Sequence, residues 1–130
     1  MTEVQGLAYE DNSGVLRMQL RQEPTAAQSA AGLPGSVVPK SSIISASLTI
    51  RDAIDETVIN SRLNEDVLAK IDTDGLFEML LDEEDFVINH TDAPEEIHVA
   101  ILTVTFTGRL GTMKLVRPAN IHVKNLDFTQ

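Results

Sequence analysis

Three histidines are the residues of this sequence best suited to metal binding or acid–base chemistry: His90, His98 and His122. His98 and His122 lie in segments that alternate like β-strands, so their side chains would approach each other if those strands paired. Such an approach would suggest a metal site, but the spacing places no third ligand. The alternative is that the histidines are surface residues or hydrogen-bonded structural residues, with His90 in a polar loop.

Four aspartates could offer oxygen ligands to a calcium ion: Asp72, Asp74, Asp82 and Asp85. Calcium takes six to eight oxygens from flexible loops. However, the sequence from Asp72 to Gly75 lacks the closing glutamate of a twelve-residue calcium loop, and short Asp-x-Asp-Gly segments are common turns. Plain turns with solvated charge are therefore the alternative, and we expect no metal and no cofactor.

No pattern in the sequence nominates a catalytic nucleophile or base. There is no cysteine. The nucleophile elbow, the phosphate-binding loop, the dinucleotide fingerprint and the zinc-protease motif are all missing. The four phenylalanines and one tyrosine give little surface for stacking on sugars or bases. We expect a binding protein and not an enzyme.

The net charge of −10 is concentrated in one part of the chain. Residues 52–97 hold fifteen acidic and two basic side chains, whereas residues 1–51 are balanced and residues 98–130 carry a net +3. An acidic surface repels nucleic acid and anionic membranes, so neither is expected as a partner. The acidic block either keeps the domain soluble or sets the register with a basic neighbour, including the end of another copy.

Alternating apolar residues predict an all-β domain. The clearest strands are expected at 15–21, 42–51 and 96–107, and the first half of the last is apolar on both faces, which favours a central position. Shorter strands are expected at 57–60, 66–71, 76–81, 113–117 and 121–124, with Pro118 marking an edge or a bend. Residues 76–85 and 64–69 could instead form short helices. About seven or eight strands in 130 residues are typical of one antiparallel β-sandwich.

The sandwich is expected to span residues 14–126, with an extended arm at 1–13, a long Pro/Gly/Ala-rich loop at 24–41 and a tail at 127–130. Such a loop is too long for a hairpin and too polar for a core element, so we expect it to be functional. The arm and the loop are the expected partner-binding segments. The residues expected to contact partners are Val4, Leu7, Tyr9, Leu33, Val37, Val38 and Phe128.

The chain from Ser42 to Leu126 resembles the immunoglobulin-like β-sandwich domains of structural proteins in tailed bacteriophages. The resemblance rests on four pieces taken in order. The first two are Thr49-Ile50-Arg51-Asp52-Ala53, which closes the opening strand, and the short return strand Thr57-Val58-Ile59-Asn60. The third is Asp74-Gly75-Leu76-Phe77, which comes before a leucine-rich strand and an Asp-Glu-Glu-Asp turn. The fourth is a long strand that begins with Glu95-Glu96-Ile97-His98 and is paired with a strand ending in Val123-Lys124-Asn125-Leu126.

The resemblance implies a virion structural protein, synthesised in the host cytoplasm, that binds copies of itself and other virion proteins. The head, as a cement or decoration protein, and the head-to-tail neck, as a connector, are the expected places. Arms exchanged between copies are a common route to closed rings. The alternative is a β-sandwich module of the tail or baseplate that binds carbohydrate or the host surface.

Overall fold

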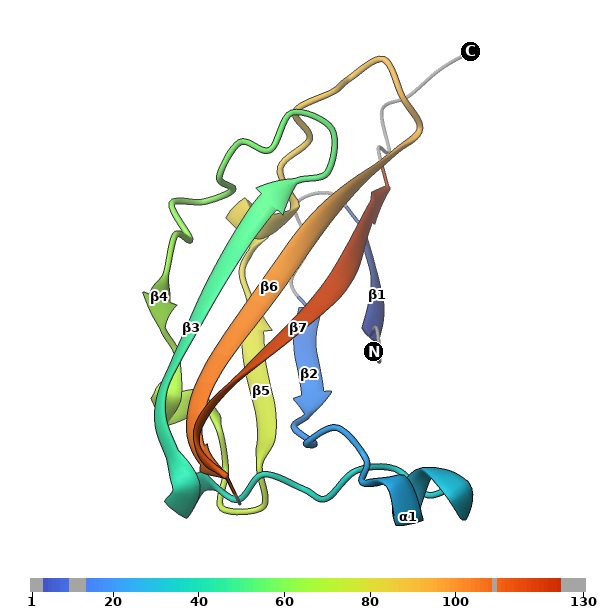
Figure 1. Cartoon of the computed structure of the whole chain (residues 1–130). Helices are drawn as coiled ribbons and strands as arrows, with labels where there is room; N and C mark the ends of the chain where they lie inside the picture. Colours follow the sequence, from blue (N-terminus) through green and yellow to red (C-terminus); the bar gives the residue numbers. More distant parts are fainter. Residues whose placement is uncertain (1–3, 10–13, 109, 125–130) are drawn as a thin grey trace.

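The computed structural model describes residues 4–9, 14–108 and 110–124, and the side chains from residue 14 onward. It consists of two β-sheets, one behind the other in Figure 1. The larger sheet has the order β1-β7-β6-β3-β4, and the smaller sheet pairs β2 with β5. The strands are β1 (Val4–Tyr9), β2 (Gly14–Gln19), β3 (Ile43–Asp52), β4 (Glu65–Asp66), β5 (Leu76–Leu81), β6 (Glu95–Gly108) and β7 (Gly111–Lys124). The all-β prediction is confirmed, with six strands of six residues or more and the two-residue β4.

The hydrophobic core lies between the sheets because alternate residues of each strand are apolar. The larger sheet contributes buried side chains such as Leu48 and Leu102, and the smaller sheet contributes Leu16, Met18 and Phe77. Fully burying one large apolar side chain stabilises a fold by about 1.5–3 kcal/mol. The burial alternates along β6 over its whole length, as the period-two pattern predicts.

The long strand β6 is central, as predicted, because β3 and β7 both pair with it in antiparallel register. A two-residue turn joins β6 to β7, with Gly108 opposite Gly111. Strand β7 continues through Pro118, where two strands were expected. Strand β1 pairs with β7 only from Ala119 onward, so the part of β7 before that point is an edge, where a residue without an N–H is tolerated.

The predicted N-terminal arm contains strand β1, which pairs in parallel with β7 of the same chain. The sandwich was expected to be antiparallel, and the other described strand pairs are antiparallel, so the β1–β7 pair is the exception. A parallel pair needs a long connection between its two strands, whereas an antiparallel pair can be joined by a tight hairpin. Strands β1 and β7 are the first and last strands of the chain, so the connection between them is long enough.

Two predicted short strands are largely replaced by other structure. Residues 57–60 form a single bridge, from Val58 to Arg51. Residues 66–71 hold the end of β4, a 3-10 helix, η2 (Leu68–Lys70), and a single bridge from Ile71 to Phe77. The backbone has positive φ angles at Glu56, Asn60, Ser61 and Asn64. Left-handed residues interrupt extended pairing, which explains why 57–60 forms no longer strand. The alternative helix at 76–85 is also wrong over 76–81, which form β5.

The long loop expected at 24–41 leaves the sandwich as an ordered excursion, which we call the projecting segment (residues 22–37). It holds one short helix, α1 (Ala26–Ala30), with no buried residue. In Figure 1 the helix stands away from both sheets. Two further 3-10 helices, η1 (Lys40–Ser42) and η3 (Glu83–Phe86), complete the described elements.

Candidate functional site

One end of the core is polar, and this end holds most of the buried ionisable groups of the described chain. Asp52 ends the buried face of β3, and Glu96 and His98 begin the buried face of β6. Asp52 lies opposite His98 in the register of the two strands. Asp85, in η3, is the fourth buried polar residue. Buried charges are stable only when they are paired or hydrogen-bonded, so each needs a partner.

Asp85 has an arginine partner. Arg62 donates from Nε to Asp85 Oδ1 at 2.5 Å and from a terminal nitrogen to Oδ2 at 2.8 Å. The Asp85 side chain is fully buried and that of Arg62 is 11% exposed. Hydrogen bonding to Asp85 raises the pKa of Arg62, so the guanidinium stays protonated. This bidentate pair ties the loop after β3 to the turn after β5.

His98 is held on both ring nitrogens. Nδ1 lies 2.9 Å from the backbone oxygen of Asp85, to which it donates, and Nε2 lies 2.5 Å from Glu96 Oε2. The His98 side chain is completely enclosed. A histidine without solvent contact and with both nitrogens engaged cannot meet a substrate, so its role is to hold Glu96 in place.

Glu96 and Asp52 each have one oxygen fixed by backbone N–H groups. Glu96 Oε1 accepts from the N–H of His90 at 2.7 Å and of Asn89 at 2.9 Å. Asp52 Oδ1 accepts from the N–H of Ile54 at 2.8 Å. The second oxygens, Glu96 Oε2 and Asp52 Oδ2, lie 3.3 and 3.4 Å from the side-chain amide nitrogen of Asn89.

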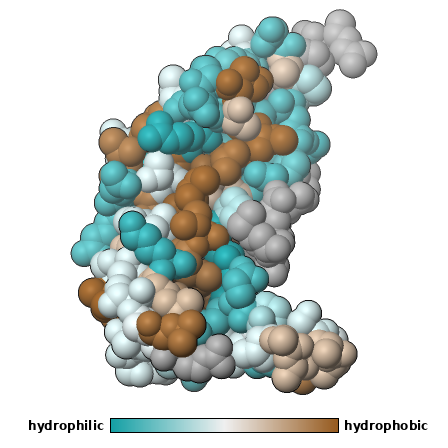
Figure 2. Space-filling model, in the orientation of Figure 1, coloured by the Kyte–Doolittle hydropathy of each residue, from teal (hydrophilic) through white to brown (hydrophobic). Residues whose placement is uncertain are grey.

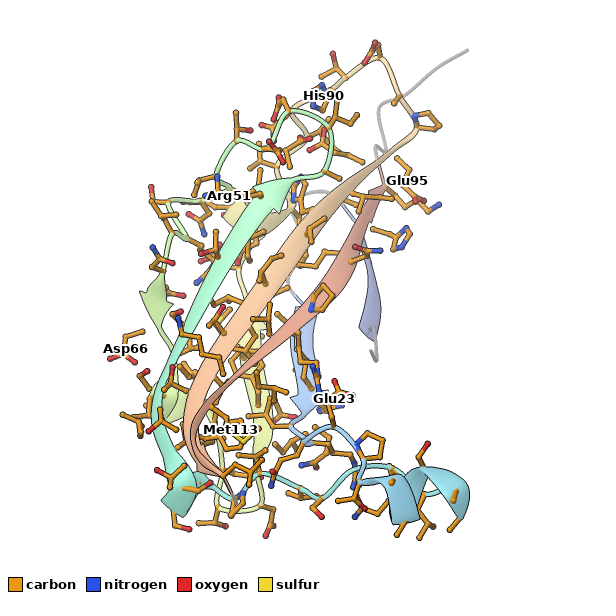
Figure 3. The ribbon with its side chains drawn as sticks, in the orientation of Figure 1. Glu23, Arg51, Asp66, His90, Glu95 and Met113 are labelled. Carbon is orange, nitrogen blue, oxygen red and sulfur yellow. The ribbon has the colours of Figure 1, made fainter. Side chains whose placement is uncertain are left out.

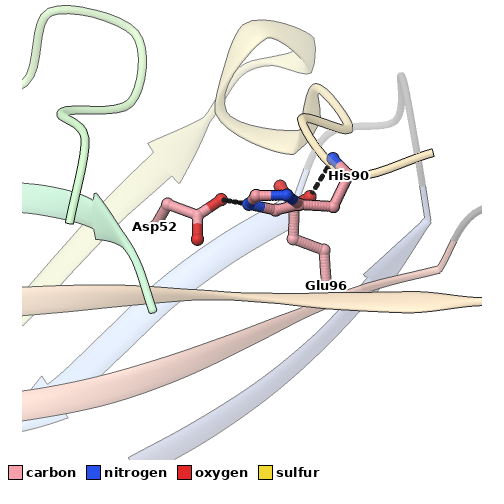
Figure 4. A group of neighbouring side chains, drawn as sticks. All are labelled: Asp52, His90 and Glu96. Carbon is pink, nitrogen blue, oxygen red and sulfur yellow. Dashed lines mark hydrogen bonds and ion pairs between the residues drawn. The ribbon is translucent and has the colours of Figure 1, made fainter. Parts of the chain in front are cut away.

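His90 reaches this cluster from the loop between β5 and β6 (Figures 3 and 4). Its Nε2 lies 3.0 Å from Asp52 Oδ2 and 3.5 Å from Asp55 Oδ2. Hydrogen bonds from the backbone and hydroxyl of Thr57 lower the pKa of Asp55, which is therefore an anion at neutral pH. The His90 side chain is 26% exposed, so the cluster meets solvent at this point.

Within the described residues, these groups offer metal ligands and hydrogen bonds. Asp52, His90 and Glu96 present ligand atoms that all lie within 4.8 Å of one another. The arrangement can hold loops together and can bind a cation.

A second feature is an apolar pocket of about 380 Å³ at the opposite end of the sandwich. The projecting segment forms one wall, and the tip of the β6–β7 hairpin forms the other. Figure 3 labels Glu23 and Met113, one from each wall. Leu110, at the hairpin tip, is 82% exposed. Figure 2 also shows an apolar band along β6, where Ile97, Val99 and Ile101 are half-buried on the outer face.

The structure places the predicted contact residues differently. Leu33 is 57% exposed on the projecting segment, and Val37 is half-buried. Val38 needs correction, because it is fully buried in the core and cannot touch a partner. Val4, Leu7 and Tyr9 lie in β1, whose side chains are not described, and Phe128 lies outside the described residues.

The four calcium candidates do not share one site. Asp72 Oδ1 accepts from the N–H groups of Asp74 and Leu76, which makes a turn before β5. Asp82 begins η3 as its N-cap, and Asp85 is engaged by Arg62. The metal-ligand geometry found among the described residues involves other side chains.

His98 and His122, whose side chains would have met if the paired strands had brought them together, lie on opposite faces of the sheet. His122 lies opposite Ile97 on the outer face of the sheet, whereas His98 faces the core. Hydrogen bonds from Lys124 and His122 lower the pKa of Glu95 there. Sequence reasoning missed Asp52 and Glu96. The sequence did contain a sign of them. Both residues stand at positions that the alternating pattern assigns to the buried face of an otherwise apolar strand, and a charged residue is rarely buried without a partner.

Comparisons with known proteins assign the chain to no family. No protein-family model matches the sequence, and no curated protein matches it. Among the described residues there is no helix with the length and apolar character that crossing a membrane requires.

Proposed function

We propose that this chain is a structural protein of a tailed-bacteriophage particle, located at the head or the head-to-tail neck. It acts by binding copies of itself and neighbouring virion proteins. The observation that carries the proposal is the projecting segment, which is closed at its base by hydrogen bonds but contributes no buried side chain from its helix.

Several hydrogen bonds fix the segment. Its base is closed by the N–H of Gln22 to the oxygen of Ser36 at 2.9 Å, and by Arg21 to the oxygen of Gly35 at 3.0 Å. A capping box between Thr25 and Gln28 begins α1. Ordering a residue costs about 1–2 kcal/mol of backbone entropy. An element that bears this cost without filling its own core is well suited to a contact outside the chain.

The chemistry of the pocket favours an apolar side chain from a neighbouring copy. Leu110, Met113 and Leu115 line the pocket together with Pro24 of the segment. Sugar binding usually relies on exposed aromatic faces, and the one aromatic residue in the lining, Phe106, is 2% exposed. Leu33 lies exposed on the same segment and would supply such an apolar side chain.

We also propose that the sandwich is immunoglobulin-like, as in the phage domains that the sequence resembles. Two packed sheets and a long hairpin, β6–β7, support this class. An experimental structure of the assembled protein tests this by its strand order.

The assembly test compares two single substitutions at exposed apolar residues. Leu33→Ser removes the side chain offered by the projecting segment, and Ile54→Ser, at a residue 74% exposed in a loop after β3, is the matched control. Sedimentation velocity at tens of micromolar should show a closed oligomer for the wild type and for Ile54→Ser, and a monomer for Leu33→Ser. All three should melt alike below the association concentration, because neither residue is in the core.

A wild type that stays monomeric at all concentrations, or a Leu33→Ser variant that assembles normally, would refute assembly through the segment. The virion location is tested separately. Mass spectrometry of particles purified from cells that carry the gene should recover the chain in many copies per particle, and its absence from intact particles would refute that location.

A further inference from the structure

We propose that Asp52, His90 and Glu96 form a binding site for a divalent transition-metal ion, with zinc as the ion that fits best. The site lies at the polar end of the sandwich (Figure 4), and Figure 3 labels His90 at this end and Glu23, of the projecting segment, at the other. It would join the end of β3, the beginning of β6 and the loop that precedes β6.

The first argument is charge. Asp52 and Glu96 are 1% and 3% exposed. Among the described residues, no lysine or arginine makes an ion pair with either, whereas Asp85 beside them has Arg62. Two buried carboxylates without a permanent cation are expensive, and metal coordination is one of the ways proteins offset this.

The second argument is distance. The three ligand atoms lie within 4.8 Å of one another, and His90 Nε2 lies 3.0 Å from Asp52 Oδ2. With metal–ligand bonds of about 2.0–2.1 Å, two ligands of a tetrahedral zinc ion are roughly 3.3 Å apart. A contraction of at most about 1.5 Å would therefore bring the set to bonding distance.

The third argument is the state of His90 Nε2. The atom is shielded from solvent and makes no aligned hydrogen bond, although the Asp52 oxygen is close. A ring nitrogen directed at a carboxylate oxygen without an aligned hydrogen bond is in a suitable position for a cation that both atoms could bind.

The fourth argument is support around the ligands. Backbone N–H groups hold Asp52 Oδ1 and Glu96 Oε1, and the second oxygens, Oδ2 and Oε2, both face the Asn89 amide. Glu96 Oε2 also contacts His98 Nε2, so this carboxylate would share its second oxygen between the ring and the metal. His98 holds Glu96 and is itself held by the Asp85 carbonyl. Hydrogen-bonded ligands of this kind are typical of metal sites. Asp55, 3.5 Å from His90, lies where a metal would reach the cluster from solvent.

A histidine with two carboxylates selects for zinc over calcium or magnesium, which prefer all-oxygen sites. The test is the melting temperature of the full chain, dialysed against chelator and then titrated with zinc chloride. Binding at a hundredfold excess over the dissociation constant should raise the melting temperature by roughly 10 °C for 130 residues. Calorimetric titration should give one ion per chain, and calcium chloride should give no shift.

His90→Gln should abolish the zinc-induced shift, because it removes the nitrogen ligand at a partly exposed position where the fold tolerates change. The matched control is His122→Gln, since His122 is 25% exposed and also faces a glutamate, but lies on the outer face of the sheet. This control should respond to zinc like the wild type. The site is refuted if the wild type shows no shift, or if His90→Gln shifts as much as the wild type.

Discussion

The Arg62–Asp85 pair is the most deeply buried ion pair that an arginine or lysine makes in the described part of the chain. Both partners are largely enclosed, the contact is bidentate, and Asn60 adds a further hydrogen bond to Asp85 at 3.1 Å. The exposed pair between Arg17 and Glu78 is equally short, at 2.5 Å, but its side chains are 60% and 48% exposed. The distance alone therefore does not show which ion pair stabilises the fold more, because solvent screens the charges of the exposed Arg17–Glu78 pair.

Arg62→Met should destabilise the protein by about 3–5 kcal/mol, because it leaves the Asp85 carboxylate buried without its cation. Arg17→Met breaks an ion pair of the same length and should cost less than about 1 kcal/mol. Urea unfolding at pH 7 measures both free energies. Equal costs would contradict the view that burial decides the strength of these pairs.

At the scale of elements, the connections between the sheets depend on close backbone contacts. Strand β5 begins at a turn where Gly75, with φ of +76°, lies against the backbone oxygen of Val38. A Cβ at Gly75 would lie 2.0 Å from that oxygen. Val38 directly follows the projecting segment, so the same contact also fixes where that segment ends relative to the turn.

Gly75→Ala tests this coupling, and Gly32→Ala is its control. Gly32 has nearly the same φ, +72°, but no atom lies within 4 Å of an added Cβ. Gly32→Ala should cost about 1 kcal/mol from the left-handed backbone alone, and Gly75→Ala at least twice that. Similar melting temperatures for the two variants would show that the contact with Val38 is easily relaxed.

At the scale of the whole molecule, the acidic composition makes stability depend on pH at the acid end. Lys124 and His122 lower the pKa of Glu95 from the ordinary value of 4.5, and Thr57 lowers that of Asp55. A carboxyl whose pKa is lower in the folded chain stabilises the fold above its unfolded pKa. It loses that contribution as the pH falls through the folded pKa.

Glu95→Gln should therefore melt slightly below the wild type at pH 7, by an amount equivalent to less than about 1 kcal/mol, because the ion pairs are partly exposed. The difference should shrink as the pH falls below 4.5 and vanish once Glu95 is protonated in the wild type. Thermal melts from pH 7 to pH 3 follow it. A difference that persists at pH 3 would assign the effect to packing and not to charge.

The sequence by itself determined the class of the fold and its three main strands. Alternation is a local property, and a strand between two others is apolar on both faces, as residues 97–101 of β6 are. It also marked the projecting segment by composition. It could not place β1 beside β7, because pairing between distant segments leaves no local pattern.

The candidate metal site was decided by the tertiary structure alone. Asp52, His90 and Glu96 come from two strands and a loop, and only the register of β3 against β6 and the path of the loop bring them within 4.8 Å. The same geometry separates His98 from His122, because adjacent residues along a strand point to opposite faces and register decides which of them meet.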